Sequence, residues 1–304
     1  MSRHIRATAM PGIIALLAAC TGADSGASQA ASTDATESGA GAACAPDSLA
    51  TKTDGRLTIG TDNPAFPPYW DPPAEGEEAT DPWELGDPTN KRGFEGAVAW
   101  AVAERLGFGD DTVDFIAVPF DNSFAPGEKE FDFYLAQVSY TDERAETVDL
   151  SDGYFFSNQA LVANADTPIT QAASIADVAD YRLGAQVGTT SFTYIEEQIQ
   201  PSEEPSVYNS NDAAIAALNA GQVDGIVVDL PTAFFITAVQ MDSGTIVGQF
   251  PAAGDEQEYF SLVLEKDSPL TGCVNEAIAD LAETQLDEIT QEWMSENAGA
   301  PILE

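Results

Sequence analysis

Short apolar runs and longer segments with helical spacing alternate along most of the chain. The apolar runs have the length of strands and lie at 57–60, 115–118, 131–138, 181–187, 223–228 and 262–264. The segments with helical spacing lie at 93–107, 191–199 and 211–220, and two further helices fit within 269–295. Such alternation is typical of α/β architecture. Because it occurs both early and in the middle of the chain, we expect two lobes, with the late strand and helices packed on the first lobe.

The first residues have the pattern of a secretory signal. Arg3 and Arg6 precede an apolar run at 13–19, which is far shorter than the ~20 residues needed to span a bilayer. The sequence LAAC, ending at Cys20, resembles the bacterial lipobox, in which the cysteine becomes the lipidated first residue. We therefore expect a signal peptide at 1–19 and lipidation of Cys20. The alternative is an ordinary cleaved signal with a chance cysteine.

The segment after Cys20 lacks the side chains that form a core. Residues 21–43 are small or polar, which is typical of a flexible tether. The expected layout is an exported protein that its N-terminal lipid anchors to the outer face of the cell membrane. The expected boundaries are 1–19 for the signal, 20–52 for the lipidated cysteine and tether, 53–158 plus 256–304 for lobe 1, and 159–255 for lobe 2.

Composition excludes several classes of function. Asp and Glu number 51 against 11 Lys and Arg, so we expect no binding to nucleic acid, which needs a basic face. The only histidine is His4, within the expected signal. Without it, a Ser-His-Asp triad, a Cys-His pair and a histidine metal site are excluded. Carboxylate chemistry and Ca²⁺ binding stay open, but no EF-hand pattern occurs, and we expect neither a metal nor a cofactor.

Besides Cys20, the expected mature chain contains two cysteines, Cys44 and Cys273. Export implies an oxidising compartment. We predict a disulfide between them that ties the start of the folded body to a late helix. The alternative is a pair of buried free thiols.

Five stretches in fixed order carry a family resemblance. They are LTIGTD at 57–62 with FPPY at 66–69, GFEG at 93–96, SYTDER at 139–144 followed by VDLSD at 148–152, QVGTTS at 186–191, and GQVDG at 221–225 running to Asp229. Together they resemble the family 3 extracellular solute-binding proteins, the polar amino-acid binders of ABC importers. The resemblance implies a type II periplasmic-binding-protein-like α/β fold, with two hinge-linked lobes that close on a ligand. It also implies a monomer whose partners are a small amino acid and the membrane subunits of an ABC permease.

Arg144 is the candidate for binding the α-carboxylate. A planar guanidinium matches a carboxylate through two parallel hydrogen bonds, and the resemblance assigns this role to the arginine of the SYTDER stretch. The alternative is a surface arginine paired with Asp142 or Glu143.

Thr189 and Thr190 follow a predicted strand and open a predicted helix. Free backbone N–H groups at such a position attract an anion, and both hydroxyls can donate to it. An N-cap role is the alternative, and both roles are compatible. A carboxylate held between Arg144 and this helix end would favour the closed state.

Asp229 follows a buried strand and suits an α-ammonium group, as the resemblance also implies. The alternative is an N-cap for the next helix. The same resemblance implies that Ser139 makes one further hydrogen bond to the α-group and that Asp62 meets the ligand side chain or amine.

Aromatic and amide side chains complete the predicted site. Phe66 and Phe120 match positions where relatives place rings around the ligand, although aromatic residues in α/β proteins more often belong to the core. We expect Gln137 to narrow or tune the pocket. Tyr69, Trp70 and Phe124 are further aromatic candidates.

An acidic insertion at 71–87, which includes Trp83, departs from the family pattern. It is either a solvated loop or a lid that draws cationic ligands to the cleft. The acids favour a basic or neutral polar amino acid as ligand, because an acidic one would need a second cation, for which Arg182 is the nearest candidate. We expect no catalysis. The alternatives are a dehydratase-type enzyme on the same fold, or a sensor that binds a modified amine or opine.

Overall fold

The computed structural model describes residues 44–254, 257–294 and 300–303. The expected signal peptide, Cys20 and the tether up to residue 43 lie outside the described residues. Within the described ranges, every helix is too short or too polar to cross a lipid bilayer.

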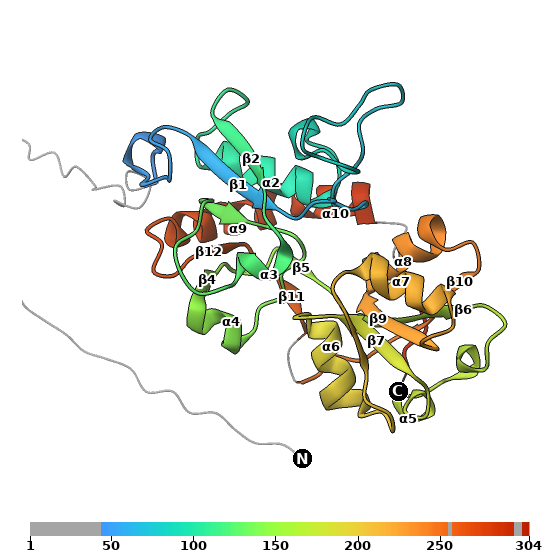
Figure 1. The fold of residues 1–304 in the computed structure, drawn as a ribbon. Helices are drawn as coiled ribbons and strands as arrows, with labels where there is room; N and C mark the ends of the chain where they lie inside the picture. Colours follow the sequence, from blue (N-terminus) through green and yellow to red (C-terminus); the bar gives the residue numbers. More distant parts are fainter. Residues whose placement is uncertain (1–43, 255–256, 295–299, 304) are drawn as a thin grey trace, which may run out of the picture. The chain divides into compact units, whose positions relative to one another are not determined.

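Two five-stranded sheets form the framework (Figure 1). The first sheet has the order β2-β1-β3-β12-β4, with β1 at Leu57–Thr61, β2 at Val113–Ala117, β3 at Phe133–Tyr134, β4 at Val148–Leu150 and β12 at Val263–Glu265. The second sheet has the order β10-β6-β9-β7-β8, with β6 at Gln159–Asn164, β7 at Leu183–Gln186, β8 at Ser206–Tyr208, β9 at Gly225–Asp229 and β10 at Gly244–Gln249. We call the sheets, with the helices packed on them, the first and second lobes.

A short antiparallel pair links the two lobes. The chain leaves the first sheet through β5, at Phe155–Phe156, and returns through β11, at Tyr259–Phe260. Phe155 pairs with Phe260, whose buried ring belongs to the core of the first lobe. The α/β class and the two hinge-linked lobes expected from the sequence are therefore confirmed.

Helices cover both sheets. The first lobe contains α2 at Phe94–Arg105, α3 at Phe120–Ser123, α4 at Asp142–Thr147, α9 at Thr271–Thr284 and α10 at Leu286–Met294. The second contains α5 at Ile175–Val178, α6 at Thr190–Tyr194, α7 at Asn211–Asn219 and α8 at Leu230–Phe235. One turn of π-helix extends α6 over Ile195–Ile199, and another extends α8 over Ile236–Gln240. Short 3₁₀ turns lie at Pro46–Ser48, Pro88–Asn90 and Pro168–Gln171.

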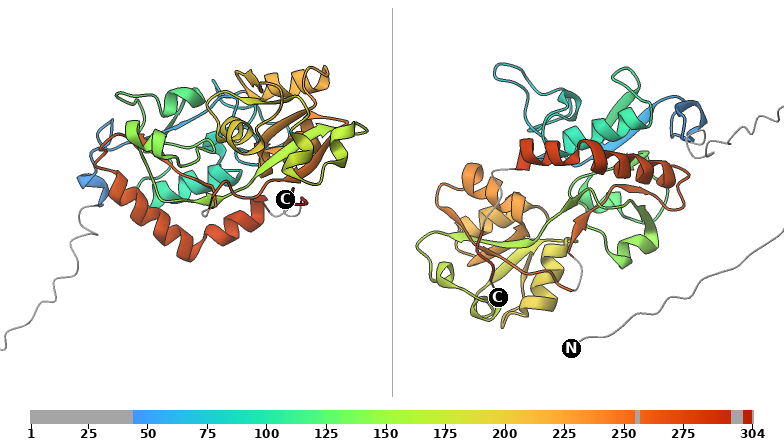
Figure 2. Two further views of the ribbon diagram at one scale, coloured as in Figure 1. Left: turned by 90° about the horizontal axis from the view of Figure 1, so that it is seen from below. Right: turned by 180° about the vertical axis from the view of Figure 1, so that it is seen from behind.

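The late helices α9 and α10 lie against α2 (Figure 2). Because α2 is covered by these helices as well as by the sheet, it is apolar almost all round. Its residues Val98, Val102 and Trp100 are all buried. This is the expected composition of a helix packed between two layers.

Successive side chains of β6 point to opposite faces of the second sheet, so this one strand contributes to a separate hydrophobic cluster on each face. Leu161 and Ala163 face the cluster under α6, while Ala160 and Val162 face the cluster under α7 and α8. Successive strand residues point to opposite faces, so a sheet covered on both sides needs apolar residues at every position.

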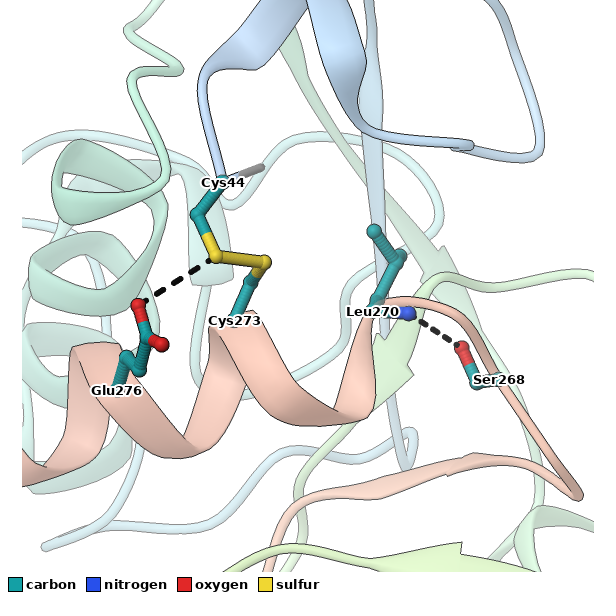
Figure 3. Close-up of a disulfide and its surroundings, with 5 residues drawn as sticks. All are labelled: Cys44, Ser268, Leu270, Cys273 and Glu276. Carbon is teal, nitrogen blue, oxygen red and sulfur yellow. Dashed lines mark hydrogen bonds between the residues drawn. A yellow bond between two sulfur atoms is a disulfide. The ribbon is translucent and has the colours of Figure 1, made fainter. Parts of the chain in front are cut away.

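The predicted disulfide between Cys44 and Cys273 is present (Figure 3). Cys273 lies in the first turn of α9, which begins just after Leu270, whose N–H donates to Ser268 Oγ at 3.3 Å. The bond ties the first described residue to a helix that is 229 positions later in the sequence. A crosslink of this kind stabilises a fold largely by restricting the unfolded chain.

Residues 300–303 differ from the expected domain division, which placed the segment 256–304 in the first lobe. The N–H of Gln249 donates to the carbonyl of Pro301 at 2.8 Å, and the N–H of Leu303 donates to the carbonyl of Gln249 at 2.9 Å. Leu303 is buried in the core of the second lobe. The edge strand β10 offers unpaired backbone groups and an apolar neighbourhood, and residues 300–303 satisfy both.

Candidate ligand-binding site

One cavity is lined by residues from both lobes. The lining includes every ligand-binding residue that the sequence predicted: Asp62, Phe66, Phe120, Gln137, Ser139, Arg144, Thr189, Thr190 and Asp229. Further lining residues are Thr61, Pro64, Ala65, Trp70, Ala136, Gln186, Asn211 and Thr232. The structure thus brings together side chains that are far apart in the sequence, such as Asp62 and Asp229, which are separated by 167 positions.

Arg144 lies in α4 and is 7% exposed. Its Nη1 donates to the carbonyl of Ser139 at 2.5 Å, and its Nη2 donates to the carbonyl of Gly188 at 2.8 Å. Its guanidinium also lies 4.5 Å from the centre of the Phe124 ring. The alternative of a surface arginine paired with its acidic neighbours is therefore wrong, because the guanidinium is buried against carbonyls and a ring.

Burial lowers the pKa of Arg144 to about 10, although Glu258 and Asp229 act in the opposite direction. The side chain stays cationic at neutral pH. An arginine has five N–H donors, so the bonds to two carbonyls leave donors for a ligand carboxylate.

Contacts across the cavity join the two lobes. Besides the bond from Arg144 to Gly188, Ser139 Oγ lies 3.4 Å from Thr190 Oγ1, and the rings of Phe66 and Phe235 are 6.4 Å apart. Gly188 has a φ of +71°, and a Cβ there would lie 3.1 Å from Asp121 Oδ1. Glycine suits this position, because it accepts the positive φ and permits the close approach.

The hydroxyl protons of Thr189 and Thr190 are both used within the protein. Thr189 Oγ1 donates to the carbonyl of Gln186 at 2.8 Å and accepts from the N–H of Phe192 at 3.1 Å, so Thr189 is the N-cap of α6. Thr190 Oγ1 donates to Glu258 Oε1 at 2.5 Å. The expectation that both hydroxyls donate to a ligand anion is therefore wrong for this structure, because protein acceptors hold both protons. The N–H groups of the first helical turn have no acceptor within the helix, and the cap takes up that of Phe192.

Asp229 ends β9 and faces the cavity. Its Oδ1 accepts from Gln159 Nε2 at 2.8 Å. Asp229 occupies the N-cap position of α8, but its side chain makes no capping hydrogen bond there. Burial, and after it the charge of Glu258, raise the pKa of Asp229 to about 8, while the bond from Gln159 and the charge of Arg144 oppose the rise. The pKa of this carboxyl therefore lies within the physiological pH range.

The other predicted residues form the walls around these charges. Asp62 follows β1, its Oδ1 accepts from the N–H of Asn63 at 2.8 Å, and burial raises its pKa. Phe66 and Phe120 are only partly buried and line the cavity, whereas Tyr69 is 1% exposed and belongs to the core. The two phenylalanines are therefore pocket walls in this structure.

Glu95 is a supporting residue whose role sequence reasoning missed. It is fully buried and accepts hydrogen bonds from the hydroxyl of Tyr154, from the N–H of Gln137 at 2.7 Å and from the side-chain amide of Gln137. These bonds hold Gln137, whose φ of 53° is unusual, against the cavity. Burial raises the pKa of Glu95 to about 7. Most residues around Glu95 in the first turns of α2 are apolar and buried, which was the signal in the sequence that this acid needs buried partners.

Gln159 and Glu258 were also missed. Gln159 Nε2 donates to Asp229 Oδ1 at 2.8 Å and to Glu258 Oε2 at 2.9 Å. Both residues lie beside the links between the lobes, and nothing in their local sequence distinguishes them. Among the described residues, no group of His, Cys, Asp and Glu has an arrangement that could hold a metal ion.

Comparison with known proteins decides the family. Residues 76–296 match the family model of the bacterial extracellular solute-binding proteins, family 3. The chain belongs to this family. It is 25% identical over 211 residues to the L-cystine-binding protein TcyJ of Escherichia coli (strain K12), a match that covers 68% of this chain and 76% of that protein.

One further relative is similar in sequence, and one solved structure is similar in fold. The chain is 23% identical over 223 residues to the arginine-binding extracellular protein ArtP of Bacillus subtilis (strain 168), which covers 70% of this chain and 82% of that protein. An ancestral arginine-binding protein bound to arginine has the same fold, with a TM-score of 0.62 at 24% identity over 79% of this chain and 98% of that one. All three of these proteins are named as binding proteins.

Proposed function

We propose that this family 3 protein captures a basic or neutral polar amino acid outside the cell and delivers it to an ABC permease. One observation carries the proposal: Arg144 and Asp229 face the same cavity from opposite lobes. A buried guanidinium and a half-buried carboxyl group at the two sides of one cavity match the α-carboxylate and α-ammonium of an amino acid. The names of TcyJ and ArtP, which bind cystine and arginine, support the same ligand class.

The proposed binding mode assigns each α-group to a different lobe. The ligand carboxylate takes free N–H donors of Arg144 and of the first turn of α6, while the ammonium takes Asp229. A ligand that contacts both lobes binds the closed form better than an open one, so it shifts the protein toward closure. The closed form is the one that docks on the permease.

The charge of the cavity narrows the ligand class. Arg144 is the cation among the lining residues, whereas Asp62 and Asp229 both supply carboxylates. An acidic side chain would face Asp62 without a second cation, because Arg182 is bound to Asp224 at 2.6 Å on the outside of the second lobe. A neutral or positive side chain avoids this repulsion.

Anchoring and the absence of catalysis are further parts of the proposal. The LAAC sequence supports export, cleavage before Cys20 and lipidation of that residue. Radiolabelled palmitate should label wild-type protein in an expressing bacterium and fail to label Cys20→Ser. Incubation with each bound amino acid should return it unchanged, and a new product would favour the dehydratase-type alternative.

A thermal-shift screen of residues 44–304 against the proteinogenic amino acids and L-cystine tests the capture function. A ligand that binds only the folded state raises the melting temperature once its concentration exceeds the dissociation constant. We expect a rise with basic or neutral polar amino acids, and none with Arg144→Ala. No rise with any of them would contradict the proposal.

A further inference from the structure

Glu258 contacts the ligand-binding site from outside the cavity. It lies just before β11, on the segment that returns from the second lobe to the first. Its Oε1 accepts from Thr190 Oγ1 at 2.5 Å, and its Oε2 accepts from Gln159 Nε2 at 2.9 Å. Glu258 lines a neighbouring cavity, with which the ligand cavity shares Thr190.

The bond to Glu258 fixes how Thr190 meets a ligand. A threonine hydroxyl has one proton, and an ionised carboxylate only accepts. The proton of Thr190 therefore points to Glu258, and the oxygen lone pairs are left for other donors. Gln159 Nε2 and Ser139 Oγ both lie 3.4 Å from this oxygen. Toward the ligand, Thr190 is an acceptor.

Gln159 connects Glu258 to Asp229. Its Oε1 accepts from Ser191 Oγ at 2.6 Å, which orients the amide so that its NH₂ group faces the acids. The same Nε2 donates to Asp229 Oδ1 at 2.8 Å and to Glu258 Oε2 at 2.9 Å. The position of Asp229 thus depends on Glu258 through a single amide group.

We propose that Glu258 is a positioning residue of the ligand-binding site, which orients Thr190 and Asp229 so that both present acceptors to the ammonium group of the amino acid. The proposal rests on the function proposed above. An ammonium has three N–H donors and no acceptor, so a pair of acceptors at this side of the cavity favours it over a neutral or anionic group. The ligand carboxylate is left to Arg144 and the N–H groups of α6.

Because of the charge of Glu258, removing this side chain's charge should change how ligand affinity depends on pH, which the loss of a packing contact would not do. Burial and the negative charges of Glu258 and Glu95 raise the pKa of Asp229 to about 8, against the bond from Gln159 and the charge of Arg144. The ammonium binds the ionised form of Asp229. Below about pH 8 the free protein must lose a proton on binding, so affinity rises as the pH rises. Removing the charge of Glu258 lowers the pKa of Asp229 and weakens this dependence.

Isothermal titration calorimetry on wild type and Glu258→Gln tests the proposal. The probes are the proteinogenic amino acids and L-cystine, and the one that binds wild type most tightly is measured at about pH 6 and about pH 8. We expect wild-type affinity to be roughly tenfold or more higher at the upper pH. Glu258→Gln should bind about tenfold more weakly than wild type at the upper pH, and its own affinities at the two pH values should differ by a smaller factor than those of wild type.

A charge control and a double variant distinguish a positioning role from a general effect of charge. Glu197→Gln removes an equal charge from the same neighbouring cavity and should leave both affinities at wild-type values. In Thr190→Val, adding Glu258→Gln should cost less affinity than Glu258→Gln costs alone, because Glu258 acts partly through Thr190. Circular dichroism checks that each variant is folded.

The outcomes separate the two proposals. Wild-type affinities in Glu258→Gln, an equal loss at both pH values, or fully additive losses with Thr190→Val would each overturn the positioning role. Failure of every probe to bind wild type would overturn the proposed function, and the role of Glu258 with it.

Discussion

The two charges of the cavity are buried in different ways. Arg144, on the first lobe, lies against the carbonyls of Ser139 and Gly188 and the ring of Phe124, and its pKa falls only to about 10. Asp229, on the second lobe, accepts from the amide of Gln159 and lies among other acids, and its pKa rises to about 8.

The difference means that the halves of the site respond differently to pH. Burial disfavours both charges, but the pKa of arginine starts so high that the guanidinium stays charged. The carboxyl starts well below neutrality and is moved to the middle of the physiological range. The first lobe thus presents a permanent cation, and the second presents a carboxyl group that must lose its proton to bind the ligand ammonium.

The largest expected effect is that of Arg144→Ala, which removes the permanent cation. Losing one partner of a buried, hydrogen-bonded charge pair costs roughly 3 kcal/mol or more, which is about a hundredfold or more in affinity. Calorimetry should show this loss at every pH, because Arg144 does not titrate in this range. The matched control is Arg182→Ala, which removes an arginine of the second lobe that is paired with Asp224 outside the cavity. Retained affinity in Arg144→Ala would break the comparison.

The variant Asp229→Asn should sharpen the comparison between the two charged groups of the cavity. The amide has the shape of the carboxyl group but lacks its charge, so we expect about a hundredfold loss of affinity at about pH 8. Affinity should also lose its rise between about pH 6 and about pH 8, since the titrating group is gone. Asp224→Asn, which breaks a surface pair on the same lobe, serves as the control. A variant at 229 that keeps the wild-type pH dependence would show that another group titrates.

Glu95→Gln tests whether a buried acid of the first lobe also titrates. Burial raises the pKa of Glu95 from 4.5 to about 7. The folded protein then binds a proton that the unfolded chain releases, so its free energy of unfolding falls between about pH 4.5 and pH 7, by up to about 3 kcal/mol from this group. Urea unfolding should show a shallower fall for Glu95→Gln.

The control for that variant is Glu104→Gln, an exposed position on the same helix α2. It should keep the wild-type slope of unfolding free energy against pH. An unchanged slope in Glu95→Gln would show that Glu95 is ionised throughout, with its charge balanced by its hydrogen bonds.

The smallest expected effect is that of neutralising the acidic insertion at 71–87. Glu75, Glu77 and Glu78 are exposed there, whereas Trp83 and Asp87 are buried and hold the segment to the body. Changing the three glutamates to glutamine should slow association of L-arginine by less than about threefold, and only at low salt, because exposed charges are screened. Stopped-flow tryptophan fluorescence measures the rate. A larger loss that persists at high salt would mean that the insertion acts as a lid.

Much of the fold follows from the pattern of apolar residues, but two neighbouring strands of the second sheet do not. The predicted strand at 223–228 corresponds to β9, and the predicted helix at 211–220 corresponds to α7. By contrast, β6 and β10 were not predicted. Strand β6 is apolar on both faces and therefore lacks the alternation of apolar and polar residues that marks a half-buried strand. Strand β10 contains glycines that interrupt its apolar pattern.

The candidate site was predictable where chemistry sits next to a recognisable element. Arg144 and Asp229 follow strand-rich stretches that also carry the family resemblance. The partners of Thr189 and Thr190 were not predictable, because their hydroxyl protons go to Gln186 and Glu258, the second of which meets Thr190 only when the chain folds back between the lobes. Sequence supplies the side chains of such a network, but tertiary structure decides which of them donate.

The most direct test of amino-acid capture is calorimetry of wild type with one ligand and its two truncated forms. L-arginine, agmatine, which lacks the α-carboxylate, and 5-guanidinopentanoate, which lacks the α-amino group, share one side chain. We predict that each truncated form binds at least about a hundredfold more weakly than L-arginine, because Arg144 and Asp229 each lose their partner. Binding of agmatine or 5-guanidinopentanoate as tight as that of L-arginine would contradict the assignment of the two α-groups to opposite lobes.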